Sequence, residues 1–141
     1  MSSSGGIIQH RERARQINDF RKFKYGDGIT PTDIDGFIDF NNTLFIWFEL
    51  KYGNTELQYG QKLALERMCD VAWHDKKHAY VFVSKHNVAD ASTDIDAALT
   101  EVTLYRYEGQ WRQPRNRISL KDAVDKCLKR HNMWEKYGEQ C

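Results

Sequence analysis

Apolar residues dominate positions 37–50, where Phe, Ile, Trp and Leu surround a short polar turn at Asn41-Asn42. Aromatic and β-branched residues favour strands, and a polar turn between two such runs is typical of a hairpin. We therefore predict two antiparallel strands in this stretch. Because alternate residues of a strand share a face, Glu49 and Lys51 point the same way.

The length of the turn decides which residue lies opposite Glu49. A three-residue loop, 41–43, places Asp35 opposite Glu49 and Asp33 opposite Lys51, all on one face. A two-residue turn shifts the register by one position and sends Glu49 to the other face from Asp35. A site that combines both acids therefore requires an odd loop or a bulge.

The face that carries these charges also carries aromatic side chains, at positions 37, 45 and 47. Charged groups among apolar residues are costly to desolvate unless each is paired or bound to a cation. The alternative is a solvated strand face on which Lys51 makes an ordinary salt bridge. A wholly exposed strand face rarely carries three aromatic residues, so the pattern favours a functional site.

The hairpin resembles that of the PD-(D/E)xK nuclease superfamily, in particular its small stand-alone members such as Holliday-junction resolvases and phage nucleases. The resemblance covers about residues 8–86 and rests on the motif Glu49-Leu50-Lys51, fourteen residues after Asp35. It implies that Asp35, Glu49 and the backbone carbonyl of Leu50 bind Mg²⁺ or Mn²⁺. It also implies that Lys51 is the catalytic lysine.

One departure from the family pattern concerns the first acid. Pro31 is followed by Thr32 and not by an acid, which leaves open whether Asp33 or Asp35 is the principal metal ligand. The hairpin register favours Asp35. In some members of the superfamily an acid on the first helix joins the metal shell, and Glu12 is the residue that this resemblance makes an auxiliary ligand.

The order of the elements predicts an α/β sandwich around a mixed sheet. The resemblance implies, more specifically, a restriction-endonuclease-like mixed central sheet flanked by helices, with an αβββαβ core. It implies a metal-dependent endonuclease that hydrolyses phosphodiester bonds in DNA, and a homodimer by the same likeness. The alternative is a catalytically silent nucleic-acid-binding or interaction module, against which the intact acid and lysine set argues. A small-molecule phosphodiesterase has less support, because neither a glycine-rich phosphate loop nor a Ser/His nucleophile is evident.

A helix is predicted over 55–72, after the second strand. Gln61 lies on its apolar stripe, which consists of Leu57, Ala64, Met68 and Val71. A polar amide on the buried side of a helix needs a hydrogen-bond partner, and Gln61 could reach the site. In the superfamily a Gln on this helix often borders the active site, and Gln61 or Gln58 resembles it. A Gln bonded to a loop carbonyl fits the pattern equally well.

Four further elements can be placed. A first helix is predicted over 9–24, with Ala14, Ile17 and Phe20 directed inward. The apolar run 79–83 is typical of a strand that is covered on both faces. Residues 90–99 form either a loop or a short helix. Ser119 is a good N-cap for a last helix with the apolar stripe Leu120, Ala123, Val124, Cys127 and Leu128.

A second hairpin is predicted from 102–107 and 111–112, where aromatic residues and arginines alternate. The aromatics could stack on bases while the arginines hold phosphates. Cross-strand packing is the better explanation for at least two of Tyr105, Tyr107 and Trp111.

Composition agrees with one globular domain. The chain has 141 residues, 40% of them hydrophobic, which is enough for a core. We predict a flexible tail at 1–8 and a single domain at 9–141. The lack of a long apolar run or signal peptide, and three cysteines (Cys69, Cys127, Cys141) in no metal-binding spacing, favour a cytoplasmic protein that does not enter a membrane.

Charge is segregated along the chain. Residues 7–24 hold six Lys and Arg against two acids, residues 25–103 hold six against thirteen, and residues 104–141 hold nine against five. The basic ends could bind the phosphates of a nucleic acid, although basic helices are often merely solvated.

Overall fold

The structure is a computed structural model that describes residues 3–4, 7–8 and 16–138. The chain divides into two compact units, Met1–Thr32 and Asp33–Cys141. Each unit is described by itself. The predicted boundary between a tail and a domain after residue 8 stays a prediction.

The first unit contains little regular structure in its described part. Strand β1 (Ser3–Ser4) pairs antiparallel with β2 (Ile7–Ile8), and a 3-10 turn, η1, covers Gly26–Gly28. Residues 16–24 are not helical, so the predicted helix over 9–24 is wrong for this part, and Ile17 and Phe20 are exposed. An apolar stripe stabilises a helix only where it packs, and these side chains are not buried. Ala14 and Glu12 lie outside the described residues.

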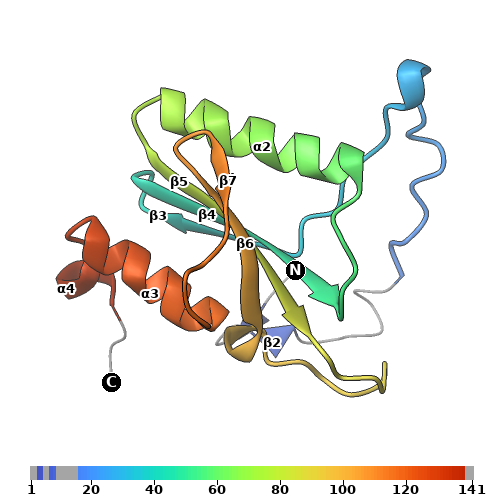
Figure 1. Cartoon of the computed structure of the whole chain (residues 1–141). Helices are drawn as coiled ribbons and strands as arrows, with labels where there is room; N and C mark the ends of the chain where they lie inside the picture. The colour runs from blue at the N-terminus through green and yellow to red at the C-terminus, as the bar shows by residue number, and fades with distance from the viewer. Residues whose placement is uncertain (1–2, 5–6, 9–15, 139–141) are drawn as a thin grey trace. The chain divides into compact units, whose positions relative to one another are not determined.

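The second unit is built on a five-stranded mixed sheet (Figure 1). The strands lie in the order β3-β4-β5-β6-β7, and only the β4–β5 pair is parallel. Their bounds are β3 Gly36–Phe40, β4 Leu44–Tyr52, β5 His78–His86, β6 Glu101–Tyr107 and β7 Gln110–Arg112. Both predicted hairpins and the predicted buried strand are therefore confirmed.

Helix α2 (Tyr59–His74) connects the two parallel strands and covers one face of the sheet, while α3 (Leu120–Arg130) covers the other (Figure 1). The α/β class with a mixed sheet between helices is thus as predicted. The αβββαβ order is not found, because two strands of this sheet, β3 and β4, precede α2. Strands β1 and β2 form a separate pair in the first unit.

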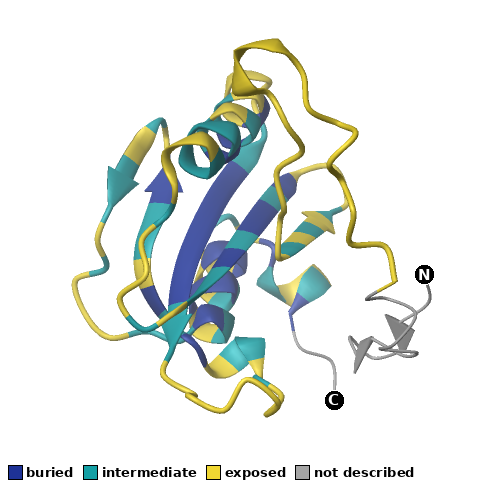
Figure 2. Ribbon diagram, turned by 90° about the vertical axis from the view of Figure 1, so that its right-hand side faces the viewer, coloured by how far each residue is buried: buried dark blue, intermediate teal, exposed yellow. Residues whose placement is uncertain are grey.

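Each face of the sheet has its own apolar core (Figure 2). The α2 face buries Trp47, Leu65, Cys69, Ala72, Ala79 and Val81. The α3 face is larger and buries residues that include Leu44, Ile46, Tyr80, Phe82, Val102, Leu120, Val124 and Leu128. Strand β5 contributes to both cores, as a strand covered on both sides should.

Helix α2 differs from its prediction in two respects. It begins at Tyr59, four residues later than predicted, and its inward residues are Leu65, Cys69 and Ala72. Val71 was predicted to face inward but is 70% exposed. The residues that face the sheet, at positions 61, 65, 68, 69 and 72, also follow helical spacing. The predicted stripe differs from them because a shift of one position rotates the face of a helix by about 100°.

The last elements follow the sequence closely. The side chain of Ser119 accepts a hydrogen bond from the backbone N–H of Asp122, which caps α3 as predicted. A short helix, α4 (Trp134–Tyr137), follows. Residues 90–99 form a loop that ends in a 3-10 turn, η2 (Ala97–Leu99). Within the described part of the chain no helix is long and apolar enough to cross a membrane.

Candidate active site

The turn between β3 and β4 sets the register of the hairpin. Phe40 pairs with Leu44, so the loop consists of three residues, 41–43, which is the first of the two alternatives that the sequence left open. Asn41 and Asn42 have positive φ angles of 52° and 61°, a conformation that asparagine tolerates better than most residues. The backbone N–H of Asn42 also donates a hydrogen bond to Asp39 Oδ1 at 2.7 Å.

This register brings Asp35 to the second strand. The last printed pair of the hairpin is Gly36 with Phe48, which makes Asp35 and Glu49 the next positions outward. Asp35 Oδ2 accepts a hydrogen bond of 2.7 Å from the backbone N–H of Leu50. Asp35 directly precedes β3 and Glu49 lies in β4, and the charge of Asp35 acts on Glu49, so the two carboxylates are close to each other, as a three-residue loop implies.

Glu49 is buried and incompletely paired. Its side chain is only 5% exposed, and Oε2 is one of two buried side-chain polar atoms without a hydrogen-bond partner among the described residues. The other is Arg112 Nε. A buried carboxylate oxygen without a partner is costly, and such groups are rare in folded proteins.

The surroundings of Glu49 disfavour its negative charge. Burial raises the pKa of Glu49 above its ordinary value, and the charge of Asp35 raises it further, while Lys51 opposes the shift. Two carboxylates this close cannot both ionise easily unless a cation or a proton lies between them. The pair is therefore able to take up positive charge.

Lys51 and Gln61 complete the cluster. Lys51 Nζ lies 3.3 Å from Glu49 Oε1 and donates a hydrogen bond of 3.0 Å to Gln61 Oε1. Gln61 is in the first turn of α2, so β4 and α2 hold the ammonium group from two sides. Of the two glutamines considered, Gln61 is the one that reaches the cluster, and Gln58 is an exposed N-cap residue.

A second lysine lies beside this cluster. Lys85 pairs in parallel register with Lys51, and neighbouring residues of paired strands share a face. Lys85 was not among the site residues predicted from the sequence. The pattern that could have identified Lys85 is a charged residue at the end of an apolar strand, in register with Lys51.

Three further site residues were predicted from the sequence, namely Asp33, Leu50 and Glu12. Asp33 is exposed and precedes the strand, so its role as a ligand stays a prediction. The role of the Leu50 carbonyl also stays a prediction. Glu12 falls outside the described ranges.

The donor set suits an oxygen-binding cation in part. Asp35 and Glu49 supply carboxylate oxygens, which Mg²⁺ prefers as ligands, and one of them, Glu49 Oε2, has no hydrogen-bond partner among the described residues. Over residues 16–138 no group of three or more His, Cys, Asp or Glu side chains gathers to hold a metal ion. Asp35 and Glu49 would therefore need substrate, water or backbone oxygens as further ligands.

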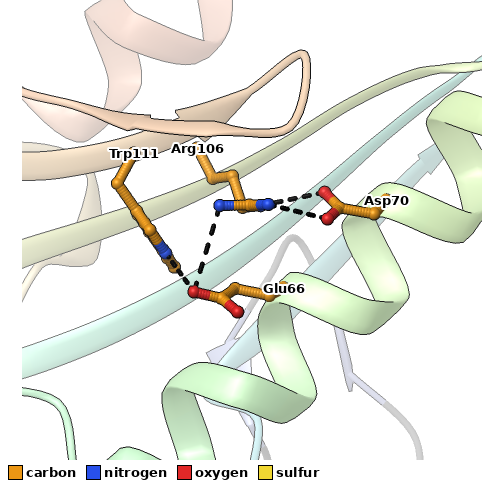
Figure 3. Close-up of polar contacts among 4 residues, drawn as sticks. All are labelled: Glu66, Asp70, Arg106 and Trp111. Carbon is orange, nitrogen blue, oxygen red and sulfur yellow. Dashed lines mark hydrogen bonds and ion pairs between the residues drawn. The ribbon is translucent and has the colours of Figure 1, made fainter.

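A second polar cluster lies on the same face of the sheet, between α2 and the β6–β7 hairpin (Figure 3). Arg106 donates to both carboxylate oxygens of Asp70, at 2.8 and 2.7 Å. Trp111 Nε1 donates to Glu66 Oε1 at 2.6 Å, and Arg106 Nη1 lies 3.9 Å from the same oxygen. Sequence reasoning missed this cluster, although acids four residues apart on a helix were visible.

The predicted aromatic packing is confirmed for two residues of that hairpin. Tyr107 is buried and stacks on Tyr80 with ring centroids 4.4 Å apart, and Trp111 packs against the α2 core. Neither ring is free to stack on a base.

Comparison of the chain with protein-family models, with curated proteins and with solved structures found no match.

Proposed function

We propose that this protein is a Mg²⁺- or Mn²⁺-dependent endonuclease that hydrolyses phosphodiester bonds in DNA, with Asp35, Glu49, Lys51 and Gln61 as its active site. The observation that carries the proposal is the buried Glu49 carboxylate, which has an oxygen without a partner beside both Asp35 and Lys51. A folded protein has little reason to keep such a group unless a ligand completes it.

The paired carboxylates would hold the cation. Asp35 is fixed by the Leu50 N–H, and Glu49 by its position inside β4, so both oxygens are oriented before anything binds. A bound divalent cation would neutralise phosphate charge and lower the pKa of a coordinated water.

Lys51 would act on the substrate phosphate. Its side chain is 17% exposed, and Glu49 and Gln61 orient its ammonium group. From this position it can stabilise negative charge on a phosphate oxygen or position the attacking water. Gln61 is a positioning residue, because its contact is with Lys51.

DNA is the substrate that the resemblance to the PD-(D/E)xK superfamily favours. The restriction-endonuclease-like arrangement and the homodimer rest on the same likeness and belong to this proposal. Lys85, in register with Lys51, adds a second positive charge on the side where a phosphate would enter.

The direct test is a cleavage screen. Plasmid, branched duplex and single-stranded DNA, with RNA of matched sequence, are incubated with Mg²⁺, Mn²⁺ or EDTA. We expect metal-dependent cleavage of DNA that falls by at least about 10²-fold in Lys51→Ala, since one electrostatic contact to a reacting phosphate contributes this much. Lys136→Ala, an exposed lysine on α4, is the matched control and should cut normally.

Metal binding is measured separately from turnover. Thermal unfolding of the wild type should shift upward with Mg²⁺ or Mn²⁺, because a ligand at about 100 times its Kd stabilises the folded state by about 2.7 kcal/mol. Glu49→Gln should lose this shift, and Glu135→Gln should keep it. Full cleavage by Lys51→Ala would exclude the proposal, whereas a metal-dependent shift without cleavage of any substrate would favour the silent binding module.

A further inference from the structure

A large cavity lies on the other face of the sheet, away from Glu49. It has a volume of about 880 Å³, is partly open to solvent, and is lined by residues of β5, β6, α3 and the segment 114–118 that leads to α3. This volume is within the range of small-molecule binding sites, about 300–1,000 Å³. Because β4 and β5 direct alternate residues to opposite faces, this cavity is separate from the candidate active site.

The floor of the cavity is aromatic. Tyr105 is half-buried, and its ring centroid lies 6.0 Å from that of Phe82, which in turn stacks on Tyr80 at 5.7 Å. Cys127 lies beside them, and burial raises the pKa of its thiol to about 12, so it stays uncharged. Tyr80 and Phe82 are buried, so Tyr105 is the aromatic ring that the floor partly exposes, with no negative charge beside it.

The rim of the cavity is basic. Five cationic side chains line it against two acids: Arg115, Arg117, Lys126, Lys129 and Arg130 against Asp122 and Asp125. Asp125 is already balanced by Lys121, whose Nζ lies 2.8 Å from its carboxylate. An anion is thus the ligand that this rim would attract.

Three of the cations are available to such an anion. Lys129 lies over the Trp134 ring at 4.5 Å and Arg130 over the Tyr107 ring at 4.6 Å, so both are engaged in part. Among the described residues, Arg115 and Lys126 have no ion-pair partner, because the ion pairs of this region join Arg117 to Glu101 and Lys121 to Asp125. Arg117 is 89% exposed and only 3.8 Å from Glu101, a contact that contributes little.

We propose that this cavity binds a nucleotide, with the base against Tyr105 and the phosphate held by Arg115 and Arg117. A planar aromatic group next to a phosphate is the ligand that matches the Tyr105 ring beside two exposed guanidinium groups. The nucleotide is either a free mononucleotide or one unit of a single-stranded nucleic acid. The inference does not depend on the proposed catalytic function.

The test is isothermal titration of the full chain in EDTA, so that no divalent cation occupies the candidate active site. The probes are AMP, ADP, a single-stranded DNA pentamer and inorganic phosphate. We expect saturable binding of the nucleotide probes and weaker binding of phosphate, which lacks a base. Tighter binding of AMP or ADP identifies the free nucleotide as the source, and tighter binding of the pentamer identifies the strand.

Variants locate the binding. Arg115→Glu/Arg117→Glu should weaken all nucleotide probes at least tenfold. Tyr105→Leu, which keeps an apolar side chain, should weaken them about tenfold without changing the response to phosphate. Arg67→Glu/Lys77→Glu makes the same change of charge elsewhere, in α2 and just before β5, and should leave affinity unchanged. Glu49→Gln should also bind normally.

Three outcomes would overturn the inference. They are the absence of saturable nucleotide binding, an affinity for phosphate equal to that for AMP, and an equal loss of binding in the Arg67→Glu/Lys77→Glu control. Near-ultraviolet circular dichroism of each variant shows whether the fold is retained, and Tyr105→Phe, which keeps the ring, should bind as the wild type does.

Discussion

The α2 face of the sheet holds two polar clusters that differ in how completely they are paired. In the cluster around Arg106, the guanidinium makes a bidentate contact with Asp70, and Glu66 accepts from Trp111 (Figure 3). In the cluster around Glu49, two acids adjoin one lysine and a carboxylate oxygen has no partner. Both clusters lie among aromatic and aliphatic side chains of one core.

The difference separates structural charges from charges that are kept for a ligand. A bidentate arginine pair, with its acids partly open to solvent, compensates the cost of burial and fixes α2 against β6. In the Glu49 cluster, burial and Asp35 instead raise the pKa of Glu49, so ionisation of this acid does not stabilise the fold. An incomplete cluster at the ends of strands is the better candidate for chemistry.

The largest contrast is expected in catalysis, when a carboxylate is replaced by an amide in each cluster. Glu49→Gln should reduce the DNA cleavage rate about 10³-fold, equivalent to about 4 kcal/mol of transition-state stabilisation. Asp70→Asn should remain within about threefold of the wild type. Single-turnover cleavage with Mg²⁺ measures both, and equal losses in the two variants would remove the distinction between the clusters.

The opposite contrast is expected in stability, when the cation of the structural cluster is removed. Arg106→Leu leaves Asp70 without its bidentate partner and Glu66 with Trp111 alone, and should lower the free energy of unfolding by about 3 kcal/mol. Arg67→Leu, at an exposed position of α2, should change it by less than about 0.5 kcal/mol. Urea denaturation gives both values. A stability of Arg106→Leu equal to that of the wild type would show that the pairing is dispensable.

Replacement of Glu49 should have a smaller effect on the free energy of unfolding, with the opposite sign. Because its pKa is raised in the folded state, the folded protein binds the proton more tightly than the unfolded chain does, and stability falls as pH rises above the ordinary value of 4.5. Glu49→Gln should therefore be more stable than the wild type at pH 7, and should lose this advantage as the pH falls to the ordinary value. Thermal unfolding across pH 4–8 without divalent cations measures this. Parallel pH profiles for the two proteins would contradict it.

The smallest effect is expected for Gln61, which acts through Lys51. Gln61→Ala should lower the cleavage rate about tenfold and leave substrate affinity nearly unchanged, because only the orientation of the ammonium is lost. Gln61→Asn, whose amide is one carbon shorter, should be no better. Gln58→Ala is the control in the same segment. A loss confined to KM would instead place Gln61 in substrate binding.

The candidate site was largely predictable because its geometry is local. Three residues in the turn fix the pairing of two adjacent strands, and the pairing then determines which face Glu49 and Lys51 share. The position of Gln61 near Lys51 was predictable because α2 follows β4 directly in the sequence. The helix stripe was less predictable, since the residues next to it, such as Val71, are also apolar and only contact with the sheet selects the buried face.

The sequence by itself determined the hairpins and the cap of α3, because each depends on turn chemistry and on alternation over a few residues. It left two registers for Asp35 and Glu49, and the structure has the one with the three-residue loop. Only the tertiary structure decided that Glu49 is buried with an unpaired oxygen and that Arg106 meets Asp70 from thirty-six residues away. It also decided that a basic, aromatic cavity opens on the far side of the sheet. Burial and distant pairing depend on how whole elements pack, and no short-range pattern in a chain encodes them.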